Sequence, residues 1–263
     1  MIFRVFVLLA VLFVTMSLGL AQAPTQANVP YGPHEKQVLD FWQAKSEAAK
    51  TPLLFFVHGG GWMTGDKANP DFLAKCLENG ISVVSINYRL IQDAQAAKID
   101  PPVKACLDDS ARALQFVRSQ ADAWKIDKER IAGCGGSAGG FTVLWLAFSP
   151  DMADAKSTDA VARESTRLRC VMAFVPQTTL DPKQMQAWIP NNEYGNHAFG
   201  LPSMADFIAK RDALLPWIER FSPYALASAN DPPVLLFYDN APNLGQPYKD
   251  TPHCGSFGAG IAE

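Results

Sequence analysis

Residues 130–148 read RIAGCGGSAGGFTVLWLAF, a stretch that predicts a strand, a sharp turn and a helix in succession. Arg130–Cys134 has the short apolar pattern of a strand, whereas Ala138–Phe148 has the longer apolar run of a buried helix. The glycines between them flank Ser137 with residues that have almost no side chain, as a sharp strand-to-helix turn requires. The context predicts a nucleophilic serine. A tight glycine turn with a bystander serine is the alternative.

A second glycine cluster, His58-Gly59-Gly60-Gly61-Trp62, follows the apolar strand pattern of Leu53–Val57. Three consecutive glycines let backbone N–H groups face a developing oxyanion. We expect His58 to brace this loop rather than to act as a general base, and Trp62 to pack beside it. The expected oxyanion-hole donors are the N–H groups of Gly60, Gly61 and Ala138.

Strand-like and helix-like segments alternate along the rest of the chain, which predicts a mostly parallel sheet covered by helices on both faces. The stretch from residue 177 to 222 interrupts this alternation and is expected to be a lid insertion containing a helix at Met204–Arg211. Further strands are expected at Ile81–Ile86, Cys170–Val175 and Val234–Tyr238, and further helices at about Pro70–Glu78 and from Pro101 to about Trp124.

The two glycine motifs, in this order, resemble the α/β-hydrolase superfamily and more narrowly the HGGG-type esterases, which include the hormone-sensitive-lipase-like and the feruloyl or acetyl-xylan esterase-like groups. Asn87-Tyr88-Arg89-Leu90 and Tyr31-Gly32-Pro33-His34 are similar to these enzymes as well. The resemblance implies an α/β-hydrolase domain over 31–263. It also implies hydrolysis of carboxylic esters through an acyl-enzyme, with acetyl or feruloyl esters of plant polysaccharide as candidate substrates.

In this fold the catalytic acid and base follow the nucleophile in the order Ser, Asp or Glu, His. Asp250 fits the acid best because it lies between the last predicted strand and the last predicted helix. Asp239, at the end of that strand, is the second candidate, and Asp181 is the third. For each of them the alternative is a loop or helix-capping carboxylate.

The base is harder to assign, because His253 alone among the four histidines follows both Ser137 and Asp250. The resembling enzymes place a helix and a strand between acid and histidine, which the residues after Asp250 cannot supply. The family pattern therefore favours a truncated chain, with the catalytic histidine and the last strand beyond Glu263. The other interpretation makes His253 the base. Truncation would leave Val234–Tyr238 as an uncovered sheet edge and a final helix from Gly255 with little to pack on.

Composition excludes several classes of protein. The chain has 263 residues, 48% of them hydrophobic, and a net charge of −3, so no basic surface indicates nucleic-acid binding. No cofactor or metal site is indicated, and a disulfide cannot be assigned among five cysteines. Cys134 and Cys170 are expected to be small core residues. A prolyl-oligopeptidase-type serine peptidase and an inactive hydrolase that only binds ligand are the alternative functions.

The first 23 residues have the pattern of a secretory signal peptide. Arg4 precedes the apolar run Val5–Leu20, and Ala21-Gln22-Ala23 offers a cleavage site. A membrane anchor is the alternative. The leader predicts a secreted or periplasmic protein with no stable membrane span after its removal, acting on a small-molecule or polysaccharide ester.

Overall fold

The computed structural model describes residues 22–68 and 70–262, so almost all of the expected signal peptide lies outside the described residues. A seven-stranded sheet in the order β1-β2-β4-β3-β5-β6-β7 forms its centre. The strands are β1 (Gln26–Pro30), β2 (Val38–Trp42), β3 (Thr51–Val57), β4 (Ser82–Ile86), β5 (Ile126–Gly136), β6 (Cys170–Phe174) and β7 (Val234–Phe237).

The sheet is parallel from β4 through β3, β5 and β6 to β7, whereas β1 and β2 pair in antiparallel fashion at the other side. In a parallel sheet all carboxyl ends meet at one edge, and ligand sites form there. The ends of β3 and β5 are directly paired, Val57 with Gly135, so the two predicted glycine motifs begin side by side.

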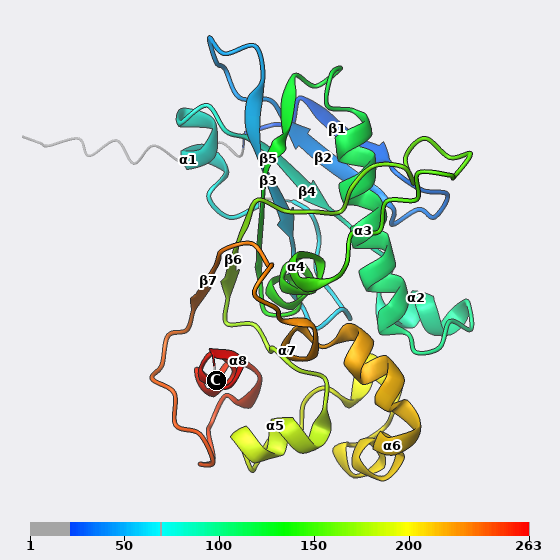
Figure 1. The fold of residues 1–263 in the computed structure, drawn as a ribbon, viewed down its shortest axis with the longest axis vertical. Coiled ribbons are helices and arrows are strands. Elements are labelled where there is room, and N and C mark those ends of the chain that lie inside the picture. Colours follow the sequence, from blue (N-terminus) through cyan, green and yellow to red (C-terminus); the bar gives the residue numbers. More distant parts are fainter. Residues whose placement is uncertain (1–21, 69, 263) are drawn as a thin grey trace, which may run out of the picture.

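Helices cover both faces of the sheet, as the alternating pattern predicts (Figure 1). Along β3, Leu53, Phe55 and Val57 belong to the larger apolar core, whereas Leu54 and Phe56 belong to a smaller one. The larger core is built with α3 and α4, and α1 packs on the smaller one. The helices of this part are α1 (Leu73–Glu78), α2 (Ile91–Ala96), α3 (Val103–Ser119) and α4 (Ala138–Phe148).

The helices after β6 gather at one end of the sheet, in the lower half of Figure 1. They are α5 (Pro182–Trp188), the 3₁₀ turn η1 (Asn196–Phe199), α6 (Met204–Phe221), α7 (Pro223–Leu226), the 3₁₀ turn η2 (Thr251–His253) and α8 (Ser256–Ala262). This arrangement brings the end of the described chain back toward the carboxyl ends of β5 and β6.

Several sequence predictions need correction. Strand β1 lies in a polar, proline-containing stretch that gave no strand signal, and it is held by pairing with β2. Cys170 is exposed rather than part of the core, because it begins β6 beside the edge strand; Cys134 is buried as expected. Helix α6 continues ten residues beyond the predicted end, through Pro216, to the buried Phe221.

The last helix, α8, packs better than expected. Phe257 is fully buried, and the Thr178 hydroxyl donates a hydrogen bond to its carbonyl at 2.8 Å. Gly260 lies so close to Trp188 that a Cβ would come within 2.3 Å of the indole. Helix α8 therefore packs on α5, an element of the 177–222 segment.

Strand β7 is the edge of the described sheet. Val234, Leu235 and Phe237 remain between 38% and 53% exposed. None of the described helices is both long and apolar enough to cross a membrane.

A buried ion pair joins the loop after β4 to α3. The Asp109 carboxylate is 2% exposed and accepts bonds from the Arg89 guanidinium at 2.6 and 2.8 Å, and from the Gln37 amide at 2.7 Å. Fork-to-carboxylate geometry makes such bonds short and directional. Arg89 belongs to the Asn87–Leu90 motif, so this pair fixes the loop that contacts the His58–Trp62 glycine cluster.

We expect Asp109→Asn to lower the free energy of unfolding by about 3 kcal/mol, because it leaves a largely buried guanidinium without its counter-charge. Urea titration measures the change. Asp108→Asn is the matched control on the same helix. It removes a half-exposed pair with Lys104 and should cost about 0.5 kcal/mol or less. Equal losses in the two variants would contradict a structural role for the buried pair.

Candidate functional site

Ser137 lies on a strained turn between β5 and α4, with φ 50° and ψ −120°. A positive φ is uncommon for a residue with a side chain and is sustained only where the surroundings enforce it. Here they do: a Cβ on Gly139 would lie 2.0 Å from the Val57 carbonyl oxygen, and one on Gly135 would lie 2.5 Å from the Gly139 carbonyl carbon. The glycines therefore permit the contact between strand and helix that lifts Ser137 out of the sheet.

The loop of residues 58–65, called the oxyanion loop for its predicted role, lies beside this turn. A Cβ on Gly59 would be 3.5 Å from the Ser137 Cβ, and Gly60 and Gly61 have φ of 97° and 63°. Among the described residues, the N–H groups of Gly60, Gly61 and Ala138 donate to no acceptor. Free donors next to a serine are what an oxyanion hole requires.

Two aromatic contacts brace the oxyanion loop, as the sequence predicts for His58 and Trp62. The Trp62 indole is buried and donates to the Thr142 hydroxyl on α4 at 3.1 Å. The His58 ring stacks on Tyr88 at 4.4 Å, and its Nδ1 is 2.8 Å from the Gly59 carbonyl oxygen. Burial lowers the pKa of His58, so the ring is neutral at pH 7. These contacts are those of a structural support.

Asp250, His253 and Ser137 form a continuous hydrogen-bonded chain. The His253 Nε2 lies 3.0 Å from the Ser137 Oγ, and its Nδ1 lies 2.9 and 3.1 Å from the two Asp250 carboxylate oxygens. The 3₁₀ turn η2 makes this possible, because side chains three residues apart eclipse each other in such a turn. Of the two sequence interpretations of the base, the geometry agrees with His253.

The hydrogen bonds also determine the tautomer. A carboxylate only accepts, so the proton of neutral His253 resides on Nδ1 and points at Asp250. Nε2 is then free to accept the proton of the Ser137 hydroxyl. This is the arrangement of a nucleophile, a general base and an orienting acid.

The other acid candidates lie elsewhere. Asp239 is exposed and forms no hydrogen bond with another described residue. Asp181 caps α5 by accepting from the Lys183 N–H at 2.9 Å, and it pairs with Arg211 at 2.7 Å. Although burial opposes ionisation, the hydrogen bonds from Arg211 lower the pKa of Asp181. Asp181 is therefore a helix cap held in an ion pair.

Sequence reasoning missed two residues that lie over the oxyanion loop. The His197 Nε2 is 3.1 Å from the Gly61 carbonyl oxygen, and its ring packs edge-on against Tyr194 at 4.7 Å. The Tyr194 hydroxyl would lie 2.7 Å from a Cβ on Gly61, so a side chain at position 61 is excluded. Burial raises the pKa of Tyr194 to about 12, which keeps the hydroxyl protonated. The sequence offered one signal for this contact, namely that Tyr194 and His197 lie three residues apart in the 177–222 segment.

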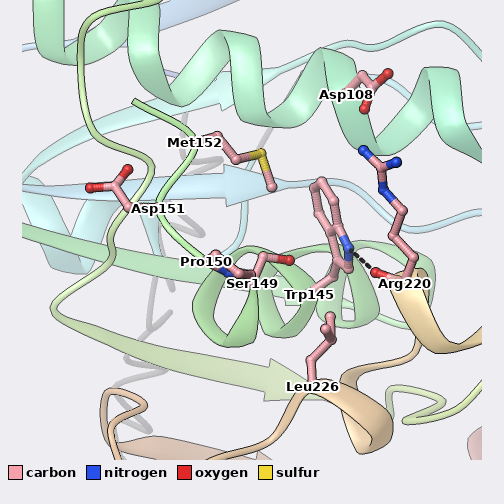
Figure 2. A pocket seen from close by; sticks show the side chains of 8 residues that line it. All are labelled: Asp108, Trp145, Ser149, Pro150, Asp151, Met152, Arg220 and Leu226. Atoms are coloured by element: carbon pink, nitrogen blue, oxygen red, sulfur yellow. Dashed lines mark hydrogen bonds between the residues drawn. The ribbon is translucent and has the colours of Figure 1, made fainter. Parts of the chain in front are cut away.

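A separate cavity of about 370 Å³ lies between α3, α4 and the helices α6 and α7. Figure 2 shows Trp145 on its wall, with the indole N–H bonded to the Arg220 carbonyl at 3.2 Å. Trp145 is two helical turns from Ser137 on α4, about 12 Å along the axis. No candidate site residue lines this cavity. Its lining is Asp108, Trp145, Ser149, Pro150, Asp151, Met152, Arg220 and Leu226.

Within residues 22–68 and 70–262, no three His, Cys, Asp or Glu side chains converge to hold a metal ion. The candidate site consists of the Asp250–His253–Ser137 chain and the oxyanion loop.

Known proteins share parts of this sequence. The versiconal hemiacetal acetate esterase of Dothistroma septosporum is 31% identical over 140 residues, which cover 52% of this chain and 38% of that enzyme. The carboxylic ester hydrolase LipN of Mycobacterium tuberculosis is 37% identical over 98 residues, or 36% of this chain and 24% of that protein. The chain thus spans less than two fifths of the length of these relatives.

Known structures share the fold. A truncated form of a carbohydrate esterase from gut microbiota superposes with a TM-score of 0.68 at 18% identity, covering 92% of this chain and 85% of that one. This likeness confirms the predicted α/β-hydrolase fold. Residues 39–247 match the BD-FAE family, a region that contains the oxyanion loop and the serine turn and ends before Asp250. The chain belongs to the BD-FAE family.

Proposed function

We propose that this protein is a serine esterase that hydrolyses carboxylic esters through an acyl-enzyme. The observation that carries the proposal is the continuous chain of hydrogen bonds from Asp250 through His253 to the Ser137 Oγ, with distances of 2.9 and 3.0 Å. The free N–H groups beside Ser137 support the same activity. The similarity to an acetate esterase and to a carboxylic ester hydrolase supports it as well. The hydrogen-bonded set of Asp250, His253 and Ser137, called the relay below, gives no support to the inactive-hydrolase alternative.

In the proposed reaction, His253 takes the Ser137 proton as the Oγ attacks the ester carbonyl. The N–H groups of Gly60, Gly61 and Ala138 stabilise the negative charge on the carbonyl oxygen. Protonated His253 then gives its proton to the departing alkoxide, which leaves an ester on Ser137. Water, activated by the same imidazole, releases the acid and regenerates the serine. Asp250 holds the imidazole in the required tautomer throughout.

We infer a short acyl group for the substrate. The Tyr194 hydroxyl and the His197 ring stand directly over Gly61 and limit the space beside the oxyanion loop. The similarity to an acetate esterase agrees with an acetyl group. His253 and Asp250 retain 35% and 59% side-chain exposure, so the relay faces an open side where a bulky alcohol such as a polysaccharide can be accommodated. Acetyl esters of polysaccharides are therefore the proposed substrate class.

Ser137→Ala should lower kcat for p-nitrophenyl acetate by ~10³-fold or more, since it removes the attacking oxygen. Thermal unfolding should change little, because a hydroxyl alone is lost. Turnover by the variant at the parent rate would contradict the assignment of the nucleophile.

Asp250 and Asp239 provide a direct comparison of the two leading acid candidates. Asp250→Asn removes the acceptor that fixes the His253 tautomer, and it should reduce kcat by roughly 10²- to 10⁴-fold. Asp239→Asn makes the same chemical change on an exposed side chain that contacts no relay member, and kcat should stay within about twofold of the parent value. A larger loss in the Asp239 variant would reverse the assignment.

The pattern of residues 1–23 supports a further proposal, that the protein acts outside the cytoplasm. A bacterium expressing the full sequence should export a product whose first residue is near Pro24, since the preceding Ala-x-Ala suits signal peptidase. N-terminal sequencing of the periplasmic fraction checks this. A cytoplasmic product that retains Met1, or a product that resists carbonate extraction from membranes, would contradict it.

A further inference from the structure

The turn that carries the relay is short and open on its outer side. It comprises one 3₁₀ turn, Thr251–His253, preceded by Asp250. A cavity of about 250 Å³, lined in part by Tyr238, Asn240 and Gly255, lies against the chain that follows it. Neighbouring side chains therefore cover only part of the turn. We expect hydrogen bonds to hold it in place.

One such contact comes from Gln177, three residues beyond the end of β6. Its side chain is 2% exposed, and the Nε2 donates a hydrogen bond to the Pro252 carbonyl oxygen. The Oε1 of the same amide is buried without a hydrogen-bond partner among the described residues. An unpaired buried acceptor costs stability. The Oε1 therefore does not stabilise the turn, and the contribution of the side chain comes from its Nε2 donor.

A second contact comes from Asn240, three residues beyond the end of β7. Its Nδ2 donates to the His253 carbonyl oxygen at 3.2 Å, and its Oδ1 accepts from the Gly255 N–H at 2.7 Å. Residue 255 must be glycine for this approach, because a Cβ there would lie 2.5 Å from the Asn240 carbonyl oxygen.

The two amides bind the two carbonyls on either side of the His253 Cα. The Pro252 carbonyl belongs to the peptide plane before that carbon, and the His253 carbonyl belongs to the plane after it. Two fixed planes determine the backbone angles of a residue and hence the direction of its Cβ. The imidazole then reaches Ser137 from a backbone position that is anchored beyond the ends of the parallel strands β6 and β7.

We propose that Gln177 and Asn240 are positioning residues of the relay, which orient His253 toward Ser137 by clamping the adjacent peptide planes. This role rests on the proposed esterase function. It predicts that the side-chain donors affect the chemical step more than substrate binding or global stability, because a displacement of about 1 Å at a reacting group can cost 10²-fold in rate.

Gln177→Met tests the proposal without introducing charge. The apolar side chain has a similar length, loses the donor to Pro252, and also removes the unpaired oxygen, so the melting temperature should remain near that of the parent. We expect kcat for p-nitrophenyl acetate to fall by about 10- to 100-fold with KM within about twofold. Gln186→Met is the matched control, since that amide also donates to a backbone carbonyl, at Asn192, away from the turn.

Asn240→Asp provides a second, independent variant. It keeps the oxygen that accepts from Gly255, but it replaces the donor to His253 with a second carboxylate oxygen and adds a negative charge. Asn191→Asp makes the same change in a side chain that brackets Tyr248 in the same way, through bonds of 2.8 and 2.9 Å. We expect kcat to fall in the Asn240 variant alone, and the pH dependence of kcat/KM to shift with it, whereas the Asn191 variant should match the parent.

Parent-like kcat in Gln177→Met and Asn240→Asp would overturn the positioning role, as would equal losses in the two control variants. A fall in kcat that is accompanied by an equivalent loss of thermal stability would also overturn it. The Ser137→Ala variant, assayed in parallel, separates these results from a failure of the proposed function. If Ser137 proves dispensable, proton NMR of the His253 Nδ1–H still tests the clamp, which predicts a hydrogen-bonded resonance in the parent that is weakened in Gln177→Met.

Discussion

The close approach of three backbone segments governs the whole site. The end of β3, the end of β5 and the first turn of α4 meet with less space than one methyl group would need, as the 2.0 Å clearance at Gly139 shows. This contact forces Ser137 into a positive φ and places the oxyanion loop beside it. Any side chain at this junction would separate the donors from the nucleophile. The glycines make this junction possible, and residues around it such as Tyr88 and Trp62 hold the loop of residues 58–65 in place.

The relay is subject to a different constraint. Asp250 and His253 must be held firmly although they lie on a segment with little regular structure. Asp250 and His253 satisfy it with one 3₁₀ turn, in which positions three apart face the same side. The turn takes its position from the ends of β6 and β7 and from α8, which is itself packed on α5. The helix, strand and long loop that separate acid and base in the resembling enzymes are therefore not a physical requirement for bringing the two side chains together.

Much of the fold could be predicted from the sequence, because its signals are local. The glycine clusters predicted the sharp turn at Ser137 and the loop at 58–65 beside it, and apolar runs located β3, β4, β6, β7 and α4 to within about two residues. Strand β1 was missed because pairing with β2, rather than its own composition, makes it extended. The base remained ambiguous for a related reason: only tertiary contacts of η2 decide whether His253 reaches Ser137. The contact of His197 with Gly61 joins residues 136 positions apart, and no periodicity signals such a pair.

In the proposed mechanism His253, oriented by Asp250, activates Ser137. Labelling by a fluorophosphonate probe tests it most directly, because the reaction reports the nucleophilicity of the serine without dependence on substrate choice. We expect labelling at Ser137, located by peptide mass spectrometry, that is ~10²-fold or more slower in His253→Ala and unchanged in His34→Ala. Labelling of His253→Ala at the parent rate would contradict it.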